Sequence, residues 1–425
     1  MIIPYNLIIF KTFRNDSSGN GEDLLTIECS GSDKLILYYI KKEKDPVWKI
    51  GKFVIFTGSS EEQNRLKTEI QYVIDSNWPG KKLKHLQLYV NPMSGWKKAK
   101  SMVKKDVLPV FELLNIKVTI LETERKGHLK EHVQTLNVDD FDGIIVAGGD
   151  GSFAELINGL LEKGMKDANL DLNTPGIRPP SPNVTLGILP CGTGNGLANS
   201  SHGCLDPVTA ALHIVKGISI PSKAFTVHSG SKFMRYGFLC GGYGVFSLAI
   251  KRSETNRWMG PLRYVYGMFS SMAQNKDFMV TTSAEVYTTD NRIDGPTEWK
   301  EFPKTVRNVE IFIYDMREGW GNTTKQGLQN ALFVCLVLPC KVWEQFKGVY
   351  KLITRNPTRF DKDCYLPFNC RSLKMEWDDD AIGYDGYINV DGEITNLPER
   401  NCCLTAFGDA FRVFGRSEKV QDEKH

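Results

Sequence analysis

The 425-residue sequence has almost no excess charge and no long apolar run. Its 53 basic and 50 acidic side chains leave a formal net charge of +3, which gives no argument for nucleic acid or another strongly charged partner. No span reaches the ~18–20 apolar residues that a membrane-spanning helix needs. Two apolar runs, Phe238–Ile250 and Ala331–Cys340, are instead predicted to be buried strands. Because basic residues follow the apolar start of the sequence rather than precede it, a signal peptide is not expected.

The sequence also lacks the common metal-binding patterns. Its ten cysteines include no CxxC pair, and the spacing of Cys364 and Cys370 fits no familiar zinc pattern. Reduced, buried thiols in a cytoplasmic protein are therefore expected. His128 and His132 share a helical face but have no HExxH context, so they are predicted to lie on a helix surface.

Residues 1–82 have the pattern of a separate module. Strands are expected near Leu35–Ile40 and Trp48–Phe56, followed by a helix near Ser60–Asp75. Strands capped by one helix resemble a small β-sandwich of the pleckstrin-homology kind. The stretch Trp78–Lys82 is a plausible linker.

From residue 83 to residue 222, short apolar strands alternate with helical patterns, which predicts an α/β domain with a parallel sheet. The expected strands are Leu86–Val90, Lys117–Leu121, Gly143–Ala147 and Thr185–Leu189. The expected helices are approximately Lys97–Leu114, Lys126–Leu136 and Phe153–Lys163. Ligands of such sheets lie at the carboxyl ends of the strands.

Residues 223–416 are rich in β-type runs, and we interpret them as a β-sandwich domain. Two helices are expected within it, near Trp258–Met272 and Val342–Thr354, with Trp258 assigned to the core. The charged residues 417–425 are predicted to form a disordered tail. The expected fold is therefore a three-layer α/β domain followed by an all-β domain, with a small N-terminal module.

Three glycine-containing loops are expected at strand ends: Asn91–Gly95, Gly148–Gly151 and Gly192–Gly196. Glycine lets backbone N–H groups approach a ligand without interference from a Cβ atom. A helix N-terminus beyond such a loop favours phosphate. One loop alone would be an ordinary tight turn, but three at the same sheet edge predict nucleotide binding.

Asp150 lies among these glycines. A carboxylate repels phosphate unless it holds a metal ion or takes a proton. A kinase needs both, because Mg²⁺ bridges the phosphates and a carboxylate accepts the proton of the attacking hydroxyl. The structural alternative is an Asp N-cap for a helix that starts at Ser152, and both could be true together.

Three motifs carry a family resemblance: "YVNPMSG", "GGDGSFAELINGL" and "LGILPCGTGNGLANS". They are similar to the successive motifs of the diacylglycerol-kinase catalytic fold shared by sphingosine kinases and ceramide kinases. The resemblance runs from about Leu83 to Phe414 and implies an enzyme that uses ATP and Mg²⁺. "DPVTAALHIVKG", "VHSGSKFMRYGFLCGGYG" and "KRSETNRWMGPLRY" look most like ceramide kinase, whereas "GTGNGLA" looks like the sphingosine-kinase form of the third loop.

The resemblance implies roles for particular residues. Asp150 would be the general base and a metal ligand. The residues expected around ATP are Asn91, Met93, Thr123, Gly148, Gly149, Gly151, Glu155, Gly192, Thr193 and Gly194. Arg257 and Arg263 would reach the phosphates, Asp391 and Glu393 would complete the nucleotide and metal environment, and Ser253 and Glu254 would contact the lipid. On spacing alone, Asp391-Gly392-Glu393 indicates an ordinary hairpin turn.

The lipid cannot be chosen from the motifs alone. Sphingosine kinases usually present an aspartate just before the Ser-Glu pair of the "SETNRW" stretch, where residues 245–252 here read VFSLAIKR. Lys251 and Arg252 would repel an ammonium group, which favours ceramide, giving ceramide 1-phosphate. Sphingosine phosphorylation and a non-catalytic lipid-binding module are the alternatives. In each case the partners are a sphingolipid and a membrane surface, without nucleic acid, and the expected location is cytoplasmic and peripherally membrane-associated.

Overall fold

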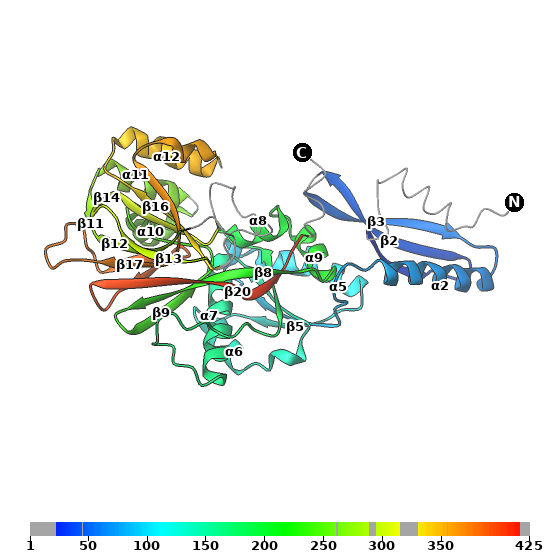
Figure 1. Cartoon of the computed structure of the whole chain (residues 1–425). Helices are drawn as coiled ribbons and strands as arrows, with labels where there is room; N and C mark the ends of the chain where they lie inside the picture. The colour runs from blue at the N-terminus through cyan, green and yellow to red at the C-terminus, as the bar shows by residue number, and fades with distance from the viewer. Residues whose placement is uncertain are drawn as a thin grey trace.

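The computed structural model describes residues 23–44, 46–260, 262–288, 295–314, 330–354 and 356–416. The N-terminal module lies at one end, the α/β part in the middle and the β-rich part with helices α10 to α12 at the other end (Figure 1). The predicted tail, residues 417–425, lies outside the described residues. No helix among the described residues is both long and apolar enough to cross a membrane.

The N-terminal module is a three-stranded antiparallel sheet with one helix packed on it. Its elements are β1 (Leu24–Cys29), β2 (Lys34–Lys44), β3 (Val47–Phe56) and α2 (Ser60–Ser76). Leu66, Ile70 and Ile74 recur at helical spacing and bury one face of α2 against the sheet. β2, β3 and α2 lie where the sequence predicts them, β1 was not predicted, and the pleckstrin-homology interpretation stays a prediction.

The module packs directly on the α/β part. Leu25 and Ile40 from its sheet join the core of that part. The Trp48 amide donates to Thr209 Oγ1 at 2.9 Å, and Lys216 Nζ lies 4.3 Å from the centroid of the Trp78 ring. The stretch predicted as a linker is therefore packed against the domain that follows it.

The α/β part contains a parallel sheet in the order β7-β6-β4-β5. These strands are β4 (His85–Val90), β5 (Lys117–Glu122), β6 (Gly143–Gly148) and β7 (Thr185–Pro190). Side chains alternate between its two faces. Ile144 and Val146 pack against helices α6 (His128–Thr135) and α7 (Asp150–Asp167).

Ile145 and Ala147 point to the opposite face of the sheet. There they meet α9 (Pro207–Val215) and the helical segment 94–113. Helices on both faces of the sheet give the three layers that the sequence predicts. The short elements α8 (Gly196–His202) and η3 (Val138–Asp140) complete this part.

The predicted continuous helix Lys97–Leu114 is wrong. The structure has four short pieces: α3 (Ser94–Lys97), α4 (Ala99–Met102), the π-turn η2 (Val103–Val107) and α5 (Leu108–Leu113). Lys97 has a φ of 65°, which ends the first turn. Pro109 in the first turn of α5 has no N–H to donate and widens the preceding turn.

The β-rich part continues the same sheet. Its strands are β8 (Ser219–Ser229), β9 (Lys232–Gly237), β10 (Cys240–Gly244), β11 (Phe278–Met279), β12 (Thr281–Tyr287), β13 (Thr297–Glu301), β14 (Thr305–Val306), β15 (Asn308–Phe312), β16 (Leu332–Val337), β17 (Tyr365–Glu376), β18 (Tyr387–Val390), β19 (Glu393–Asn396) and β20 (Asn401–Phe414). The described strands other than β1 to β3, β11 and β14 form one mixed sheet of fifteen strands.

Strand β20 joins the two halves of this sheet. Its first half is antiparallel to β17, and β8 runs antiparallel along most of its length. Near its end, Arg412 and Val413 pair in parallel with Thr185 and Leu186 of β7. The α/β part and the β-rich part therefore share backbone hydrogen bonds instead of being joined by a flexible linker.

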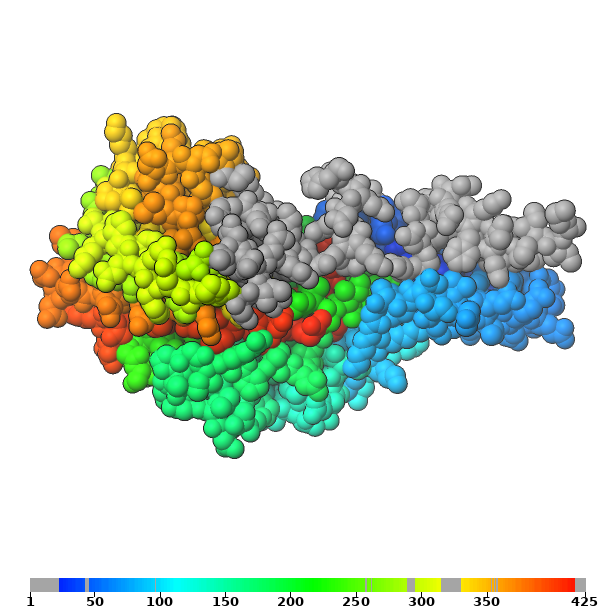
Figure 2. Space-filling model, in the orientation of Figure 1, coloured from blue at the N-terminus to red at the C-terminus, as the bar shows by residue number. Residues whose placement is uncertain are grey.

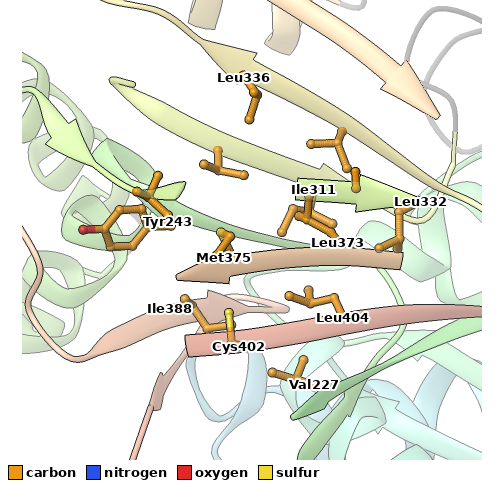
Figure 3. Packing of buried hydrophobic residues seen from close by; sticks show 14 of the residues in the cluster. Val227, Tyr243, Ile311, Leu332, Leu336, Leu373, Met375, Ile388, Cys402 and Leu404 are labelled. Atoms are coloured by element: carbon orange, nitrogen blue, oxygen red, sulfur yellow. The ribbon is translucent and has the colours of Figure 1, made fainter. Parts of the chain in front are cut away.

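The core of the β-rich part is formed by apolar side chains from many strands. Figure 3 shows side chains from β8, β10, β15, β16, β17, β18 and β20 pointing into one cluster. The cluster includes Ile311, Leu336 and Leu373, which are fully buried. An all-β region next to the α/β part is thus present as predicted.

Helices in this part are α10 (Val245–Thr255), η4 (Arg257–Met259), α11 (Leu262–Ala273), α12 (Val342–Ile353) and η5 (Pro357–Asp361). The predicted buried strand Phe238–Ile250 is half wrong, because the chain leaves β10 at Gly244, whose φ is 94°, and enters α10. A buried apolar run does not distinguish strand from helix by its periodicity. The assignment of Trp258 to the core is also wrong, since its side chain is 82 % exposed.

Glu310→Gln tests a buried ion pair of the β-rich part. Arg359 Nη2 lies 2.6 Å from Glu310 Oε1, and both side chains are 2 % exposed. The substitution leaves a buried guanidinium without its counter-charge and is expected to cost about 3–5 kcal/mol in the free energy of unfolding. Urea unfolding measures it. The control Asp167→Asn breaks the exposed Lys163–Asp167 pair and is expected to cost at most about 1 kcal/mol; equal costs would contradict the argument.

Candidate active site

The three glycine loops meet at one edge of the sheet. β4, β6 and β7 are parallel neighbours, so the loops that leave their carboxyl ends lie side by side. They line a cleft of about 1310 Å³, whose other wall comes from the β-rich part. The predicted site residues in its lining are Asn91, Met93, Thr123, Gly149, Asp150, Gly151, Glu155, Gly192, Thr193, Gly194, Glu254, Arg263, Asp391 and Glu393.

Two predicted residues do not line the cleft. Gly148 is the last residue of β6, and a Cβ atom on it would lie 2.8 Å from Ser152 Oγ. Ser253 is fully buried in α10 and donates its hydroxyl to the Ile250 carbonyl at 2.8 Å. The side chain of Arg257 lies outside the described part of the chain.

Several glycines let the loops approach one another. A Cβ atom on Gly149 would lie 2.5 Å from the Gly194 carbonyl oxygen, and one on Gly192 would lie 2.4 Å from Gly149 Cα. Gly95 has a φ of 56°, and a Cβ atom on it would lie 2.4 Å from the Cys191 carbonyl oxygen. A Cβ atom on Gly151 would meet nothing within 4 Å. Gly151 therefore leaves open space at the start of α7, where a phosphate group fits.

Asp150 connects two of the loops. Its Oδ2 accepts a hydrogen bond from the Gly196 amide at 2.8 Å, and its Oδ1 accepts one from the Leu197 amide at 3.1 Å. These amides are orphan donors at the start of α8, so Asp150 caps α8 rather than its own helix. The structural alternative, in which Asp150 caps a helix that starts at Ser152, does not hold, because Gly149 occupies the N-cap position of α7.

The environment of Asp150 favours a basic carboxylate. The residue is half-buried in the cleft wall. Burial raises the pKa of Asp150 above its ordinary value, and the hydrogen bonds from Gly196 and Leu197 oppose part of that rise. A carboxylate with a raised pKa is a better proton acceptor, and its two amide donors hold it in one orientation.

Asn91, Thr123 and Glu155 hold the loops in place. Asn91 Nδ2 donates to Ser152 Oγ at 3.0 Å, which ties the first loop to the second. The Thr123 amide donates to the Val90 carbonyl at 2.9 Å. Glu155 Oε1 accepts from the Gly127 amide at 2.9 Å, which fixes the loop after β5.

Asp391 organises the opposite wall. It lies in the two-residue turn between β18 and β19, and both Asp391 and Gly392 have positive φ. This is the tight hairpin that the spacing indicates. The Asp391 carboxylate accepts hydrogen bonds from three amides, those of Phe238, Leu239 and Cys240, at 2.9–3.0 Å. Burial raises the pKa of Asp391 to about 6, although the nearby Arg235 and these amides oppose the rise.

Glu393 forms a bridge across the cleft. Its Oε2 lies 3.0 Å from Arg235 Nη1, within the β-rich part. Its Oε1 lies 3.0 Å from Lys126 Nζ, on the loop after β5. Burial works to raise the pKa of Glu393, but Arg235 and Lys126 together hold it below its ordinary value. The two cleft walls are thus linked by an ion pair at one end.

Cationic side chains gather along the remaining wall. Arg263 Nη1 lies 3.6 Å from Glu254 Oε1, and Arg263 Nη2 donates to the Tyr264 hydroxyl at 2.7 Å. Lys251 lines the cleft with its Nζ 4.2 Å from the centroid of the Tyr387 ring. Glu254 therefore faces a cation within the site.

The carboxylate in the cleft suits an Mg²⁺ ion that substrate phosphates also hold. It does not suit a metal site built from protein side chains alone. Among the described residues, no group of three or more His, Cys, Asp or Glu side chains could hold a metal ion. Mg²⁺ is commonly held by one or two carboxylates together with substrate phosphates and water. The Asp150 carboxylate lines the cleft and each of its oxygens accepts one hydrogen bond, which leaves a lone pair on each.

Arg125 and Lys126 line the cleft although the sequence did not assign them to it, and Lys251, which the sequence indicated only as a charge that repels an ammonium group, lines it as well. Arg125 and Lys126 follow β5, so the rule that ligands lie at the carboxyl ends of parallel strands could have found them. Lys251 had a signal as well, because it lies in the stretch 245–252 that lacks the expected acid, but its place in the wall depends on helix α10, which the sequence did not predict.

Part of the chain is similar in sequence to known proteins. Residues 85–227 match the family described as diacylglycerol kinase catalytic domain. The human protein "Ceramide kinase" is 35 % identical over 201 residues, which cover 47 % of this chain and 37 % of that protein. "Sphingosine kinase 1" of Arabidopsis thaliana is 31 % identical over 225 residues, covering 50 % and 42 % respectively. The chain thus spans less than half of the length of these two relatives.

A solved structure shows the same fold. A putative diacylglycerol kinase from Bacillus anthracis str. Sterne superposes with a TM-score of 0.54 at 19 % identity, over 79 % of this chain and 96 % of that one. Together these findings confirm the resemblance to ceramide kinases and sphingosine kinases, and the diacylglycerol-kinase-like fold with its mixed sheet and all-β region.

Gly149→Ala and Gly151→Ala form a matched pair that tests the packing of the loops. The Gly149 substitution pushes a methyl group against the Gly194 backbone and is expected to cost about 1–3 kcal/mol. The Gly151 substitution meets open space in a helix and is expected to leave stability unchanged or slightly raised. Thermal unfolding of both variants measures the difference. Equal melting temperatures would contradict the close approach of the two loops.

Proposed function

We propose that this protein is an ATP-dependent sphingolipid kinase that phosphorylates the primary hydroxyl of ceramide to give ceramide 1-phosphate. The observation that carries the proposal is Asp150, which lines a cleft together with three glycine loops at one sheet edge. The similarity to ceramide kinases and sphingosine kinases supports the same reaction class.

The nucleotide would lie along the glycine loops. The open space at Gly151 and the start of α7 suit a phosphate group, because N–H groups and the helix dipole point there. Arg125, Lys126 and Arg263 supply positive charge from both walls of the cleft. Arginine offers a planar fork of donors that matches phosphate oxygens.

Asp150 would act on the lipid hydroxyl. As the hydroxyl oxygen bonds to the γ-phosphorus, the bond from that phosphorus to the bridging oxygen breaks and ADP leaves. The hydroxyl proton passes to a carboxylate oxygen of Asp150, whose raised pKa favours the transfer. The amides of Gly196 and Leu197 keep the carboxylate directed during this step.

Mg²⁺, when bound, would neutralise charge on the transferring phosphates, with Asp150 as its protein ligand. The predicted metal role of Asp391 and Glu393 is better described as positioning. The Asp391 carboxylate already accepts hydrogen bonds from three amides. The Glu393 carboxylate already pairs with Lys126 and Arg235.

The charge of the lipid site favours a neutral acceptor. Lys251 lines the cleft on α10, close to Glu254, which is paired with Arg263. An incoming ammonium group would meet Lys251 and would have to compete with Arg263 for Glu254. Ceramide carries no such charge. Sphingosine is the second candidate, because Glu254 is an acid in the cleft wall that could pair with its amine.

We expect the enzyme to work in the cytoplasm, at the surface of a membrane that holds its substrate. The N-terminal module, interpreted as pleckstrin-homology-like, would assist this association. A purely lipid-binding role without catalysis is disfavoured by the oriented carboxylate of Asp150 at an intact set of phosphate-type loops.

Asp150→Asn is expected to lower kcat by about 10²–10⁴, because an amide cannot accept the hydroxyl proton. In the native protein kcat/KM should fall on the acidic side, since protonated Asp150 is inactive. Because burial raises this pKa, the fall should occur above the ~3.9 of an ordinary aspartate. Radiolabelled ATP with dispersed ceramide, assayed across pH, measures both effects.

The control for this substitution is Asp139→Asn, an exposed aspartate that does not line the cleft. Nucleotide binding and melting temperature must be measured alongside, because asparagine turns an N–H group toward one of the two α8 amides. Near-native turnover by Asp150→Asn would remove the proposed base.

A panel of ceramide, sphingosine and diacylglycerol decides the substrate. Ceramide is expected to give the highest kcat/KM. Lys251→Glu should raise the ratio of sphingosine to ceramide turnover, because it replaces a repelling charge with an attracting one. Faster turnover of sphingosine than ceramide by the native protein would show that the second candidate is correct.

A further inference from the structure

Helix α8 has the Asp150 carboxylate at one end and a pair of buried histidines at the other. The amides of Gly196 and Leu197 begin the helix and donate to Asp150, whereas His202 ends it. Nδ1 of His202 lies 3.2 Å from Nδ1 of His213 in α9, and the two rings stack with their centroids 5.3 Å apart. Because α8 has only seven residues and is about 10 Å long, a shift at its last residue reaches its first amides.

The second ring nitrogen of His202 binds the sheet. Strand β20 pairs with β7 at Thr185 and Leu186. Beyond that pairing, Nε2 of His202 lies 3.0 Å from the Ile188 carbonyl oxygen. A carbonyl oxygen can only accept, so Nε2 of His202 carries the hydrogen. His202 therefore fixes the end of α8 on the strand that leads into the third glycine loop.

The surroundings keep both rings neutral. Figure 2 shows the blue N-terminal module lying directly against the α/β part, and Trp48 of that module covers His213, with the ring centroids 4.2 Å apart. His202 is fully buried and His213 is 2 % exposed. Burial lowers the pKa of His202 to about 4, the bond to Ile188 opposes that shift, and the Arg416 charge adds to it. Burial, His202 and Arg416 lower the pKa of His213 well below its ordinary value.

Neutrality fixes the place of each hydrogen. A neutral imidazole has one N–H group and one bare nitrogen. His202 uses its hydrogen on the Ile188 carbonyl, so its Nδ1 is the acceptor and Nδ1 of His213 must donate. Nε2 of His213 is then bare, which agrees with its having no hydrogen-bond partner among the described residues. The bond between α9 and α8 thus has one direction, and an apolar residue at position 213 would leave the His202 acceptor buried and unpaired.

We propose that His202 and His213 are positioning residues for phosphate transfer, because they fix α8 and, through its first two amides, the direction of the Asp150 carboxylate. Neither histidine lines the cleft, so the pair acts through α8 and not on a substrate. The purpose of the pair rests on the proposed kinase function, but its geometry does not.

His213→Leu and His213→Asn separate the hydrogen bond from the presence of the histidine. Leucine removes the donor, whereas the asparagine amide nitrogen is as many bonds from the backbone as Nδ1 and keeps it. Hydrogen exchange of the Gly196 and Leu197 amides is followed by mass spectrometry on the full chain without nucleotide. It is expected to become about tenfold faster in His213→Leu and to stay within about threefold of native in His213→Asn.

The pH dependence of kcat/KM gives an independent measurement. The two α8 amides oppose the rise in the pKa of Asp150, so weakening them raises this pKa further. In His213→Leu the acidic fall of kcat/KM for ceramide should therefore move to higher pH by about half a unit, and kcat should drop about tenfold. His213→Asn should restore both. A loss of packing alone would lower stability without moving the acidic fall.

His228→Leu is the matched control. His228 is also 2 % exposed, and its Nε2 lies 2.9 Å from the Leu172 carbonyl, but it belongs to β8 and does not line the cleft. It should lose stability as His213→Leu does while α8 exchange and the acidic fall stay native. If His213→Leu does not fold, His202→Gln replaces it, because glutamine still reaches the Ile188 carbonyl but has no acceptor at the Nδ1 position. All exchange is measured well below the lowest melting temperature.

Native exchange at Gly196 and Leu197, or an unmoved acidic fall, in His213→Leu would overturn the proposal, and so would an equal change in His228→Leu. If the native chain transfers phosphate to none of the lipids, exchange alone decides. Faster exchange in His213→Leu but not in His228→Leu would then keep the link from the histidines to Asp150 and remove only the proposed function.

Discussion

The site depends on one carboxylate that accepts two backbone hydrogen bonds. Asp150 leaves the second glycine loop at the start of α7 and receives the amides of Gly196 and Leu197 from the third. The amide of Asp150 in turn donates to the Gly194 carbonyl at 3.0 Å. These bonds satisfy the free end of α8 and fix the distance between two phosphate-type loops. The group that we propose as the proton acceptor is thereby held in one direction by the backbone itself, which needs no flexible side-chain partner.

The second constraint is the continuous sheet. Strand β20 pairs with β17 and β8 on one side of the molecule and with β7 on the other. Backbone hydrogen bonds of this strand therefore join the two parts of the chain that supply the cleft walls. The Lys126–Glu393 pair links the walls again above it. The opposite wall is rigid for a related reason, since Asp391 takes three amides and fixes the β18–β19 turn against β10.

Much of the α/β part could be predicted, because its strands are short apolar runs that end in glycine, and parallel strands place those ends on one edge. The same reasoning identified Asp150, and the family resemblance supplied the other predicted site residues, most of which line the cleft. The reasoning failed where one apolar pattern fits two different structures and tertiary packing decides between them. Helix α10 could not be distinguished from a buried strand, and the core assignment of Trp258 failed because an apolar residue type does not tell whether its side chain meets the core or solvent. The role of Asp150 as a cap for α8 rests on a contact across 46 positions of sequence, which no local pattern contains.

The position of β20 in the sheet has a consequence for how the chain reaches this structure. β7 ends at Pro190, whereas its neighbour β20 begins at Asn401. Until that late segment has emerged from the ribosome, one side of β7 is an open edge with unpaired N–H and C=O groups, next to a hydrophobic sheet. Such long-range pairing is slow, and an uncovered edge invites pairing with other chains. The α/β part is therefore completed only when the last strand of the β-rich part pairs with β7, so a nascent or truncated chain that stops before β20 exposes a sheet edge that invites pairing with other chains.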